Sequence, residues 1–147
     1  MKFLLWIVLL AVVLLFAYVR LAPVDPGVWH VDPRSGHKGK GRWLILPDAA
    51  PVLSRDGESA GALLARLDAI ARATPRTMVI AGSVAEGRIT YETRSQFWGF
   101  PDYSTVEAVA VPGGATLAIY ARLRFGRGDM GVNRRRVENW LGLLAQD

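Results

Sequence analysis

The chain begins with a long apolar run. Every residue from Phe3 to Val19 is apolar or aromatic, and the run continues for two more residues after Arg20. A helix needs about 17 to 20 such residues to cross the hydrocarbon layer, whereas a secretory signal has an apolar core of about 7 to 15. Arg20 and Pro23 also stand where a cleavage site would lie. We predict an uncleaved transmembrane anchor over residues 1–22, with a signal peptide as the alternative.

Helical periodicity begins after Asp56, which we expect to be the N-cap of a helix. The apolar residues that share one face of this helix are Leu63, Leu64, Leu67, Ile70 and Ala71. Thr74-Pro75 ends the pattern, because a residue before proline disfavours the helical conformation. The segment is predicted to be an amphipathic helix that lies on a sheet.

Four strands are predicted after this helix, at 77–81, 88–95, 105–111 and 116–125. The last alternates most regularly, and its apolar face consists of Leu117, Ile119, Ala121, Leu123 and Phe125. Short turns, such as Pro112-Gly113-Gly114, join neighbouring strands. Short connections imply an antiparallel meander with one face open to water.

A second amphipathic helix is predicted at the C-terminus, with Val132, Val137, Trp140 and Leu144 at helical spacing and Asp129 as its N-cap. The element order is then helix, four strands, helix, without a crossover between parallel strands. This order predicts an α+β fold: an antiparallel four-stranded meander with two helices packed on one face, preceded by one transmembrane helix.

Residues 23–51 have the composition of a spacer, since they hold five prolines, several glycines and a basic stretch at 37–42. We therefore predict an anchor over 1–22, a Pro/Gly-rich spacer over 23–51 and an α+β domain over 52–147. Within the spacer, the apolar run from Trp43 to Leu46 could add an edge strand. Trp29 either lies at the membrane interface or packs on the domain.

Three segments carry a resemblance to a known family: Thr90-Tyr91 with Thr93-Arg94-Ser95, then 99–103, and above all 126–136. The last has the pattern Gly-x-x-Asp-x-Gly-x-Asn-x-x-Arg. The chain resembles the bacterial Domain of Unknown Function 1499 family over about residues 47 to 145. The resemblance implies no established activity, but many relatives look exported or membrane-attached. The residues it singles out, for structure or for binding, are Asp102, Gly126, Asp129, Gly131, Asn133 and Arg136.

One departure from the family limits what can be carried over. Relatives commonly have Ser-x-Ser-Arg before the glycine, whereas this chain has Ala121-Arg122-Leu123-Arg124. A role for those two hydroxyl groups therefore cannot apply here.

The formal net charge is +5, from 15 arginines and 3 lysines against 13 acidic residues. A basic balance favours anionic partners. For an anchored protein we expect anionic lipid or an envelope protein and do not expect nucleic acid; the alternative is a solvated basic surface without a partner. The chain has no cysteine, which excludes disulfides, thiolate catalysis, Cys-ligated metals and attachment of lipid through Cys.

The strongest functional candidate is a cluster of arginines near the last strand and the last helix. We predict an anion-binding face formed by Arg94, Arg122, Arg124 and Arg127. Alternation in the last strand places Arg122 and Arg124 away from the core. The alternative is a structural clamp in which Arg124 and Arg136 pair with Asp129 and neighbouring carboxylates.

An unrecognised enzyme that uses Asp102, Asp129 and an arginine is the second hypothesis, although no catalytic residue can be assigned. We expect no cofactor and no metal, because the only histidines, His30 and His37, lie in the spacer without a zinc-binding spacing. The segment 97–103 contains four aromatic residues, which either form a ligand lid, a partner contact or a membrane-dipping wedge, or fold back over the core.

We expect a single-pass protein of the cell (inner) membrane. The short N-terminal tail with Lys2 and the exported relatives favour a domain on the extracytoplasmic side. Lys38, Lys40 and Arg42 favour the cytoplasmic side if they are counted, so this alternative stays open.

Overall fold

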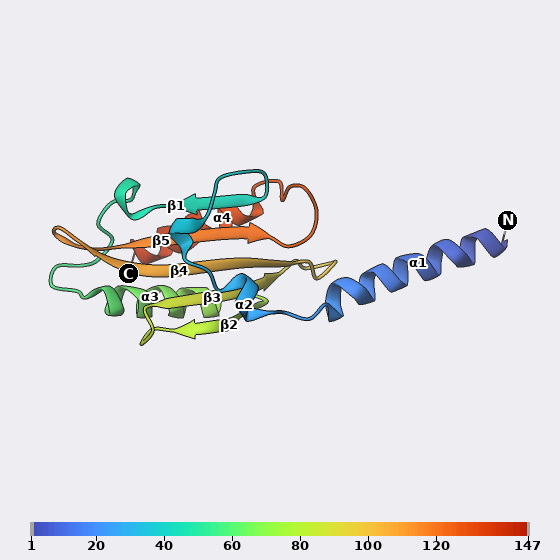
Figure 1. The fold of residues 1–147 in the computed structure, drawn as a ribbon, viewed down its shortest axis with the longest axis horizontal. Coiled ribbons are helices and arrows are strands. Elements are labelled where there is room, and N and C mark those ends of the chain that lie inside the picture. The colour runs from blue at the N-terminus through green and yellow to red at the C-terminus, as the bar shows by residue number, and fades with distance from the viewer. Residues whose placement is uncertain (1, 147) are drawn as a thin grey trace.

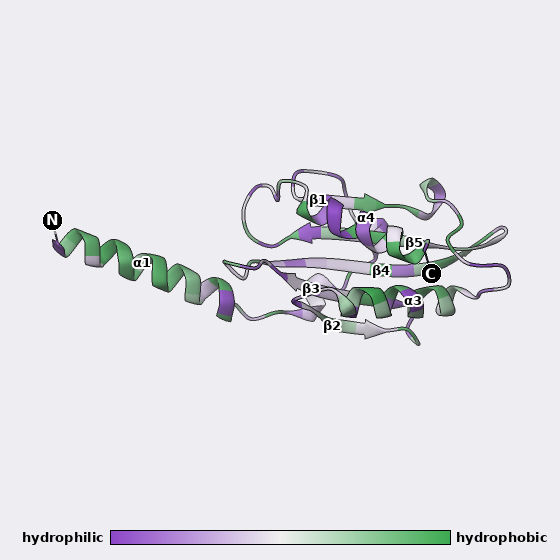
Figure 2. Cartoon of the chain, turned by 180° about the vertical axis from the view of Figure 1, so that it is seen from behind, coloured by the Kyte–Doolittle hydropathy of each residue, from purple (hydrophilic) through white to green (hydrophobic). Residues whose placement is uncertain are grey.

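The structure is a computed structural model that describes residues 2–146. Helix α1 (Lys2–Leu21) projects from one end of a compact α+β body (Figure 1). It is hydrophobic along most of its length and becomes hydrophilic in the turn nearest the sheet (Figure 2). With 20 residues, α1 is long and apolar enough to span a membrane. An N-terminal signal sequence can have the same length and composition. We call the end of the body from which α1 leaves the α1 end.

The body contains one antiparallel sheet in the order β1-β5-β4-β3-β2. Its strands are β1 (Arg42–Ile45), β2 (Thr77–Ser83), β3 (Arg88–Arg94), β4 (Pro101–Val111) and β5 (Gly114–Leu123). The predicted meander is confirmed, but the predicted number of four strands is wrong. The apolar run at Trp43 forms the fifth strand, and Trp43 lies opposite Ala121 at the edge of the sheet.

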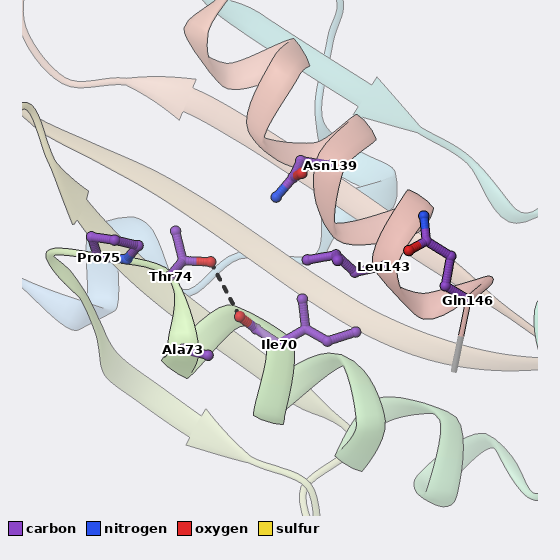
Figure 3. Close-up of a pocket in the computed structure, with 7 residues that line it drawn as sticks. All are labelled: Ile70, Ala73, Thr74, Pro75, Asn139, Leu143 and Gln146. Carbon is purple, nitrogen blue, oxygen red and sulfur yellow. Dashed lines mark hydrogen bonds between the residues drawn. The ribbon is translucent and has the colours of Figure 1, made fainter.

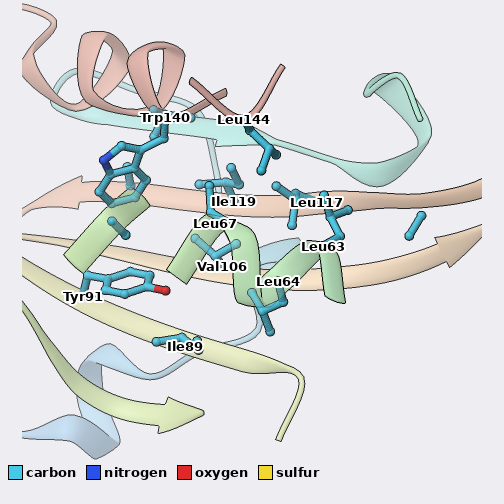
Figure 4. Close-up of a cluster of buried hydrophobic side chains, with 14 residues drawn as sticks. Leu63, Leu64, Leu67, Ile89, Tyr91, Val106, Leu117, Ile119, Trp140 and Leu144 are labelled. Carbon is cyan, nitrogen blue, oxygen red and sulfur yellow. The ribbon is translucent and has the colours of Figure 1, made fainter. Parts of the chain in front are cut away.

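Helices α3 (Ala60–Ala73) and α4 (Val132–Leu144) cover one face of this sheet, as predicted (Figure 2). Between them and the sheet lies the core, in which Leu63, Leu67 and Trp140 are fully buried (Figure 4). The Trp140 indole meets Tyr91 edge-on, with ring centroids 5.6 Å apart, and donates a 2.8 Å hydrogen bond to Oγ1 of Thr74. The amphipathic periods of both helices therefore predicted most of their buried faces correctly, but Val132, which was expected on the buried face of α4, is 39% exposed.

The predicted N-caps need correction. Ser59, not Asp56, caps α3, and its Oγ accepts a 3.1 Å hydrogen bond from the Ala62 N–H. At α4 the N-cap position is Gly131, at φ 78°, and Asp129 lies two residues earlier. Met130 and Gly131 separate Asp129 from the first residue of α4, because the chain passes through a left-handed conformation before the helix starts.

Leu123 and Phe125 are only half-buried, although the alternation in the last strand placed them in the core. Strand β5 ends at Leu123, so the chain leaves the sheet before Phe125. The Phe125 ring then meets Tyr18 of α1 and Phe100, at centroid distances of 5.9 and 6.2 Å.

The second face of the sheet is covered by residues 25–37, which we call the strap. It contains a short helix α2 (Pro26–Trp29) and a 3-10 turn η1 (Pro33–Ser35), while a second such turn, η2 (Pro47–Ala49), follows β1. The Trp29 ring stacks on Tyr103 at 4.0 Å, and Nδ1 of His30 is 2.9 Å from Oγ1 of Thr90. Much of the segment predicted to be a spacer thus lies against the sheet, and Trp29 packs on the domain.

Candidate functional site

The α1 end gathers four segments that are distant in sequence. The loops from β3 to β4 and from β5 to α4 lie there, together with the turn from α3 to β2 and the segment that leads into β1 (Figure 1). Helix α1 contacts two of these segments through Phe16, whose ring is 6.4 Å from that of Trp98, and through Tyr18 on Phe125. Val19 is consequently buried, whereas most of α1 is exposed.

The long motif at 126–136 forms a clamp at the start of α4. The Asp129 carboxylate accepts hydrogen bonds from the N–H groups of Gly131 and Asn133, at 3.0 and 2.7 Å. Arg136 donates to Oδ1 of Asn133 at 2.8 Å and pairs with Asp102 of β4 at 3.1 Å. Asp129 and Arg136 therefore hold α4 in place, but the acid that Arg136 pairs with is Asp102 rather than Asp129.

The two acids of the clamp have opposite electrostatic environments. Burial raises the pKa of Asp102 above its usual value, and Arg136 only partly opposes this effect. Burial also acts to raise the pKa of Asp129, but the backbone N–H groups of Asn133 and Gly131 outweigh it and hold the pKa below its usual value. Both carboxylates are already engaged in structural hydrogen bonds, so this geometry does not favour their use as a catalytic pair.

Arg122 lies on the face away from the helices, as predicted, but the strap covers it. Only 6% of its surface is exposed, and its guanidinium lies over Tyr120 and Trp29, 4.7 and 5.2 Å from the ring centroids. It also donates to the backbone oxygen of Trp29. Burial lowers the pKa of Arg122 to about 10. Arg122 is therefore a link between sheet and strap and does not reach the surface.

A buried carboxylate, Glu92, links two of the arginines that were predicted to bind an anion, Arg94 and Arg124. Glu92 is 2% exposed, pairs with Arg94 at 2.6 Å and accepts a 3.1 Å hydrogen bond from the Tyr103 hydroxyl. Arg124 donates to the same hydroxyl at 3.2 Å, and Arg94 also donates to the Gly99 carbonyl at 3.1 Å. Arg94 and Arg124 thus share one network, while Arg127 lies exposed in the loop after β5.

Cations at the α1 end mostly lack counterions. Among residues 2–146, the exposed or half-buried arginines of this end with no carboxylate oxygen within 4.0 Å are Arg20, Arg42, Arg76, Arg124, Arg127 and Arg135. Elsewhere on the body, Arg34 and Arg88 share Glu107, and Arg66 pairs with Glu58. The positive charge of the chain is therefore concentrated where α1 leaves the body.

Apolar side chains project from the same end. Phe97 and Trp98, in the loop between β3 and β4, are 79% and 54% exposed, and Met130, in the loop before α4, is 92% exposed. The aromatic segment 97–103 is thus divided. Phe97 and Trp98 point outward, whereas Tyr103 is buried under Trp29.

Two of the hollows near this surface lie beside α4. An open cleft of about 450 Å³ is lined by Arg76, Arg94, Asp102, Arg135 and Arg136, among others. A shallow groove of about 380 Å³ runs between α3 and α4 (Figure 3). Within residues 2–146 there is no group of three or more potential metal ligands, and the two histidines lie in the strap, next to Thr90 and Tyr120.

Sequence reasoning missed the strap, although the sequence carries a sign of it. Asp25-Pro26 and Asp32-Pro33 each place an aspartate N-cap before a proline at the first helical position. The carboxylates accept hydrogen bonds from Gly27 N and Arg34 N, at 2.9 and 2.8 Å. Two such capped turns indicate an ordered segment rather than a flexible linker.

Comparison with known proteins identifies the family. No curated protein matches the chain, and no solved structure matches it. One family model covers residues 42–144, which include all five strands, both body helices and the clamp motif. The chain therefore belongs to the family described as Protein of unknown function (DUF1499).

Proposed function

We propose that this chain is a single-pass membrane protein whose α1 end rests on the bilayer and binds anionic lipid headgroups. The observation that carries the proposal is the coincidence of three features at one end of the body. The apolar helix leaves there, the arginines without counterions lie there, and Phe97 and Met130 are exposed there. Apolar and cationic side chains together are typical of surfaces that contact membranes.

The contact between α1 and the loop from β3 to β4 determines how deep this loop lies in the bilayer. Phe16 lies five residues before the end of α1 at Leu21. At a rise of 1.5 Å per residue it lies about 7.5 Å inside that end. Because Trp98 contacts Phe16, the tip of the loop must reach the headgroup layer when α1 spans the membrane. Indole rings are enriched at that depth.

The arginines give this contact its expected strength and salt dependence. Each basic side chain near an anionic surface contributes about 1 kcal/mol. Three or four of the six arginines acting together would therefore hold the body firmly against an anionic bilayer. Salt weakens the attraction, since the Debye length is about 10 Å at 0.1 M ionic strength. In keeping with the sequence analysis, we place the protein in the inner membrane with its domain on the extracytoplasmic side.

The absence of cysteine allows a direct test. Phe97→Cys in the full chain gives a single thiol for an environment-sensitive fluorophore. In nanodiscs, we expect a blue shift that is larger in a phosphatidylcholine and phosphatidylglycerol mixture than in phosphatidylcholine alone, and that decreases in high salt. Arg42→Gln/Arg127→Gln should reduce the difference between the two lipids. A matched control is Arg55→Gln/Arg88→Gln, which removes the same charge from elsewhere on the body.

Equal emission from both kinds of nanodisc would refute the proposal. So would an equal effect of the two double variants, because the response would then depend on net charge alone. Cleavage of the chain after α1 in the source cell would show that the helix is a signal sequence.

A further inference from the structure

We infer that the cleft and the groove beside α4 form one site for an amphiphile with a single apolar chain and a phosphate group. The phosphate would lie among the arginines of the cleft, and the apolar chain between α3 and α4. The inference rests on the proposed function for the source of the ligand, because lipids with this chemistry reside at the membrane surface where the site lies.

The cleft brings four guanidinium groups together from three segments. Arg76 precedes β2, Arg94 ends β3, and Arg135 and Arg136 belong to the first turns of α4. The one acid in the lining is Asp102. A lining with four cations and one anion favours an anionic ligand.

Two of these four arginines are bound to carboxylates and two are not. Arg136 is held by Asp102, and Arg94 by Glu92. In contrast, among the described residues the Arg76 side chain donates only to the Arg94 carbonyl, at 3.0 Å, and the Arg135 side chain only to the Met130 carbonyl, at 2.9 Å. Each therefore keeps N–H groups for a ligand. A phosphate accepts such donors well, because the planar guanidinium fork matches two of its oxygens.

Backbone strain occurs in the cleft at Arg76 and outside its lining at Met130. Within residues 2–146, the non-glycine residues with positive φ are Arg76, at 58°, and Met130, at 50°. Such conformations are costly for residues with a Cβ and are often retained at functional sites. Here one of them positions the Arg76 side chain in the cleft, and the other presents the carbonyl that orients Arg135.

The groove between α3 and α4 continues from the cleft. Thr74, Pro75 and Asn139 line both hollows. Beyond them the groove is lined mainly by apolar side chains, and Figure 3 shows Ile70 on α3 and Leu143 on α4. Leu143 is 43% exposed although it is a large apolar residue. A chain bound next to a phosphate in the cleft would cover it.

The shape favours one chain rather than two. The groove is a single shallow trough between two helices, and it runs from Thr74 and Asn139, which it shares with the cleft, towards Gln146 (Figure 3). A lipid with two chains would leave one of them in water. A free phosphate would use the cleft but not the groove, and a neutral or cationic amphiphile would leave Arg76 and Arg135 without an anion.

The test measures binding of soluble alkyl phosphates to the full chain in phosphatidylcholine nanodiscs by calorimetry. The probes are inorganic, methyl, butyl and hexyl phosphate, with hexyltrimethylammonium as the charge control. Complete burial of a methylene strengthens binding about fourfold, so a half-open groove should give about twofold per methylene. Butyl phosphate should therefore bind about eightfold more tightly than methyl phosphate, and hexyltrimethylammonium should not bind.

Three variants separate the parts of the site. Arg135→Gln should weaken binding of every phosphate about tenfold, since it removes charged hydrogen bonds. Leu143→Asn should leave methyl phosphate unchanged and reduce the gain with chain length. Lys38→Gln, which changes an exposed cation outside the cleft, should leave binding of all the alkyl phosphates unchanged. Thermal unfolding of each variant checks that the fold is retained.

Affinity that does not increase with chain length would overturn the inference and leave only a phosphate site. Absence of binding, or equal weakening by Lys38→Gln and Arg135→Gln, would overturn it as well. The proposed function fails separately, because it depends on emission from the Phe97 position in anionic nanodiscs rather than on binding of alkyl phosphates in neutral ones.

Discussion

Trp29→Ala tests whether the strap is part of the folded body. The ring of Trp29 stacks on Tyr103 with centroids 4.0 Å apart, and the Trp29 backbone oxygen accepts a 3.1 Å hydrogen bond from Oγ1 of Thr105. The substitution removes the ring and leaves the backbone oxygen in place. It therefore reports on the side-chain contact between the strap and the sheet.

The expected loss follows from burial and stacking. Truncation of a fully buried aromatic side chain to alanine costs about 3 to 5 kcal/mol. Trp29 is half-buried, so about 2 kcal/mol is expected from this source. Stacked aromatic pairs contribute about 0.5 to 1.5 kcal/mol beyond burial. We expect Trp29→Ala to lower the free energy of unfolding by about 2 to 3 kcal/mol.

Urea unfolding of the full chain in nonionic detergent, followed by circular dichroism, measures this loss. Val28→Ala is the matched control, because the neighbouring side chain is 58% exposed. It should change the free energy of unfolding by less than about 0.5 kcal/mol. A loss under about 1 kcal/mol for Trp29→Ala, or one equal to that of the control, would mean that the strap is not docked in solution.

Further predictions concern the core, a turn and the clamp. Trp140→Ala should cost about 3 to 5 kcal/mol in the same assay, and a loss below about 1 kcal/mol would contradict the packing of α4. Gly82→Ala should cost more than Gly87→Ala. Both have positive φ, but a Cβ at Gly82 would overlap the backbone of the facing strand, whereas nothing lies within 4 Å of one at Gly87. A lowered pKa means that Asp129 stabilises the fold above the unfolded value of 3.8 and loses this effect as the pH falls through its folded value. The deficit of Asp129→Asn should therefore be largest near neutral pH and close in acid. The pKa of Asp102 is raised, so its contribution to the free energy of unfolding should increase as the pH falls through its folded value, which unfolding measured against pH would show.

The parts of the fold that follow from local patterns could be predicted. The helix faces at Leu67 and Val137 and the alternation at Ile119 result from periods of 3.6 and 2, which are visible within a short window. Strand β1 has only four residues and a single neighbouring strand, so its pattern is too short to settle its place. The strap depends on contacts such as Trp29 with Tyr103, which are 74 positions apart.

The same limit applies to the candidate site. Alternation correctly placed Arg122 on the face away from the helices, but alternation cannot show what covers that face. The sequence named Asp129 but not Asp102 as the acid that pairs with Arg136, because Asp102 is 34 positions away while Asp129 is close in sequence. The concentration of unpaired arginines at the α1 end became visible only when the ion pairs of the other arginines were known.

The docked strap also limits how far the domain can move from the end of α1. Between Leu21, where α1 ends, and Pro26, where the strap begins its first turn, only residues 22–25 can act as a tether. Four extended residues reach about 14 Å at most. With α1 in the bilayer, the domain can neither tumble freely nor extend to a distant surface, and a partner must come to it at the membrane. Undocking of the strap would lengthen this tether to residue 41, just before β1 begins at Arg42. If α1 spans the membrane as proposed, the strap determines how far from that membrane the domain can act.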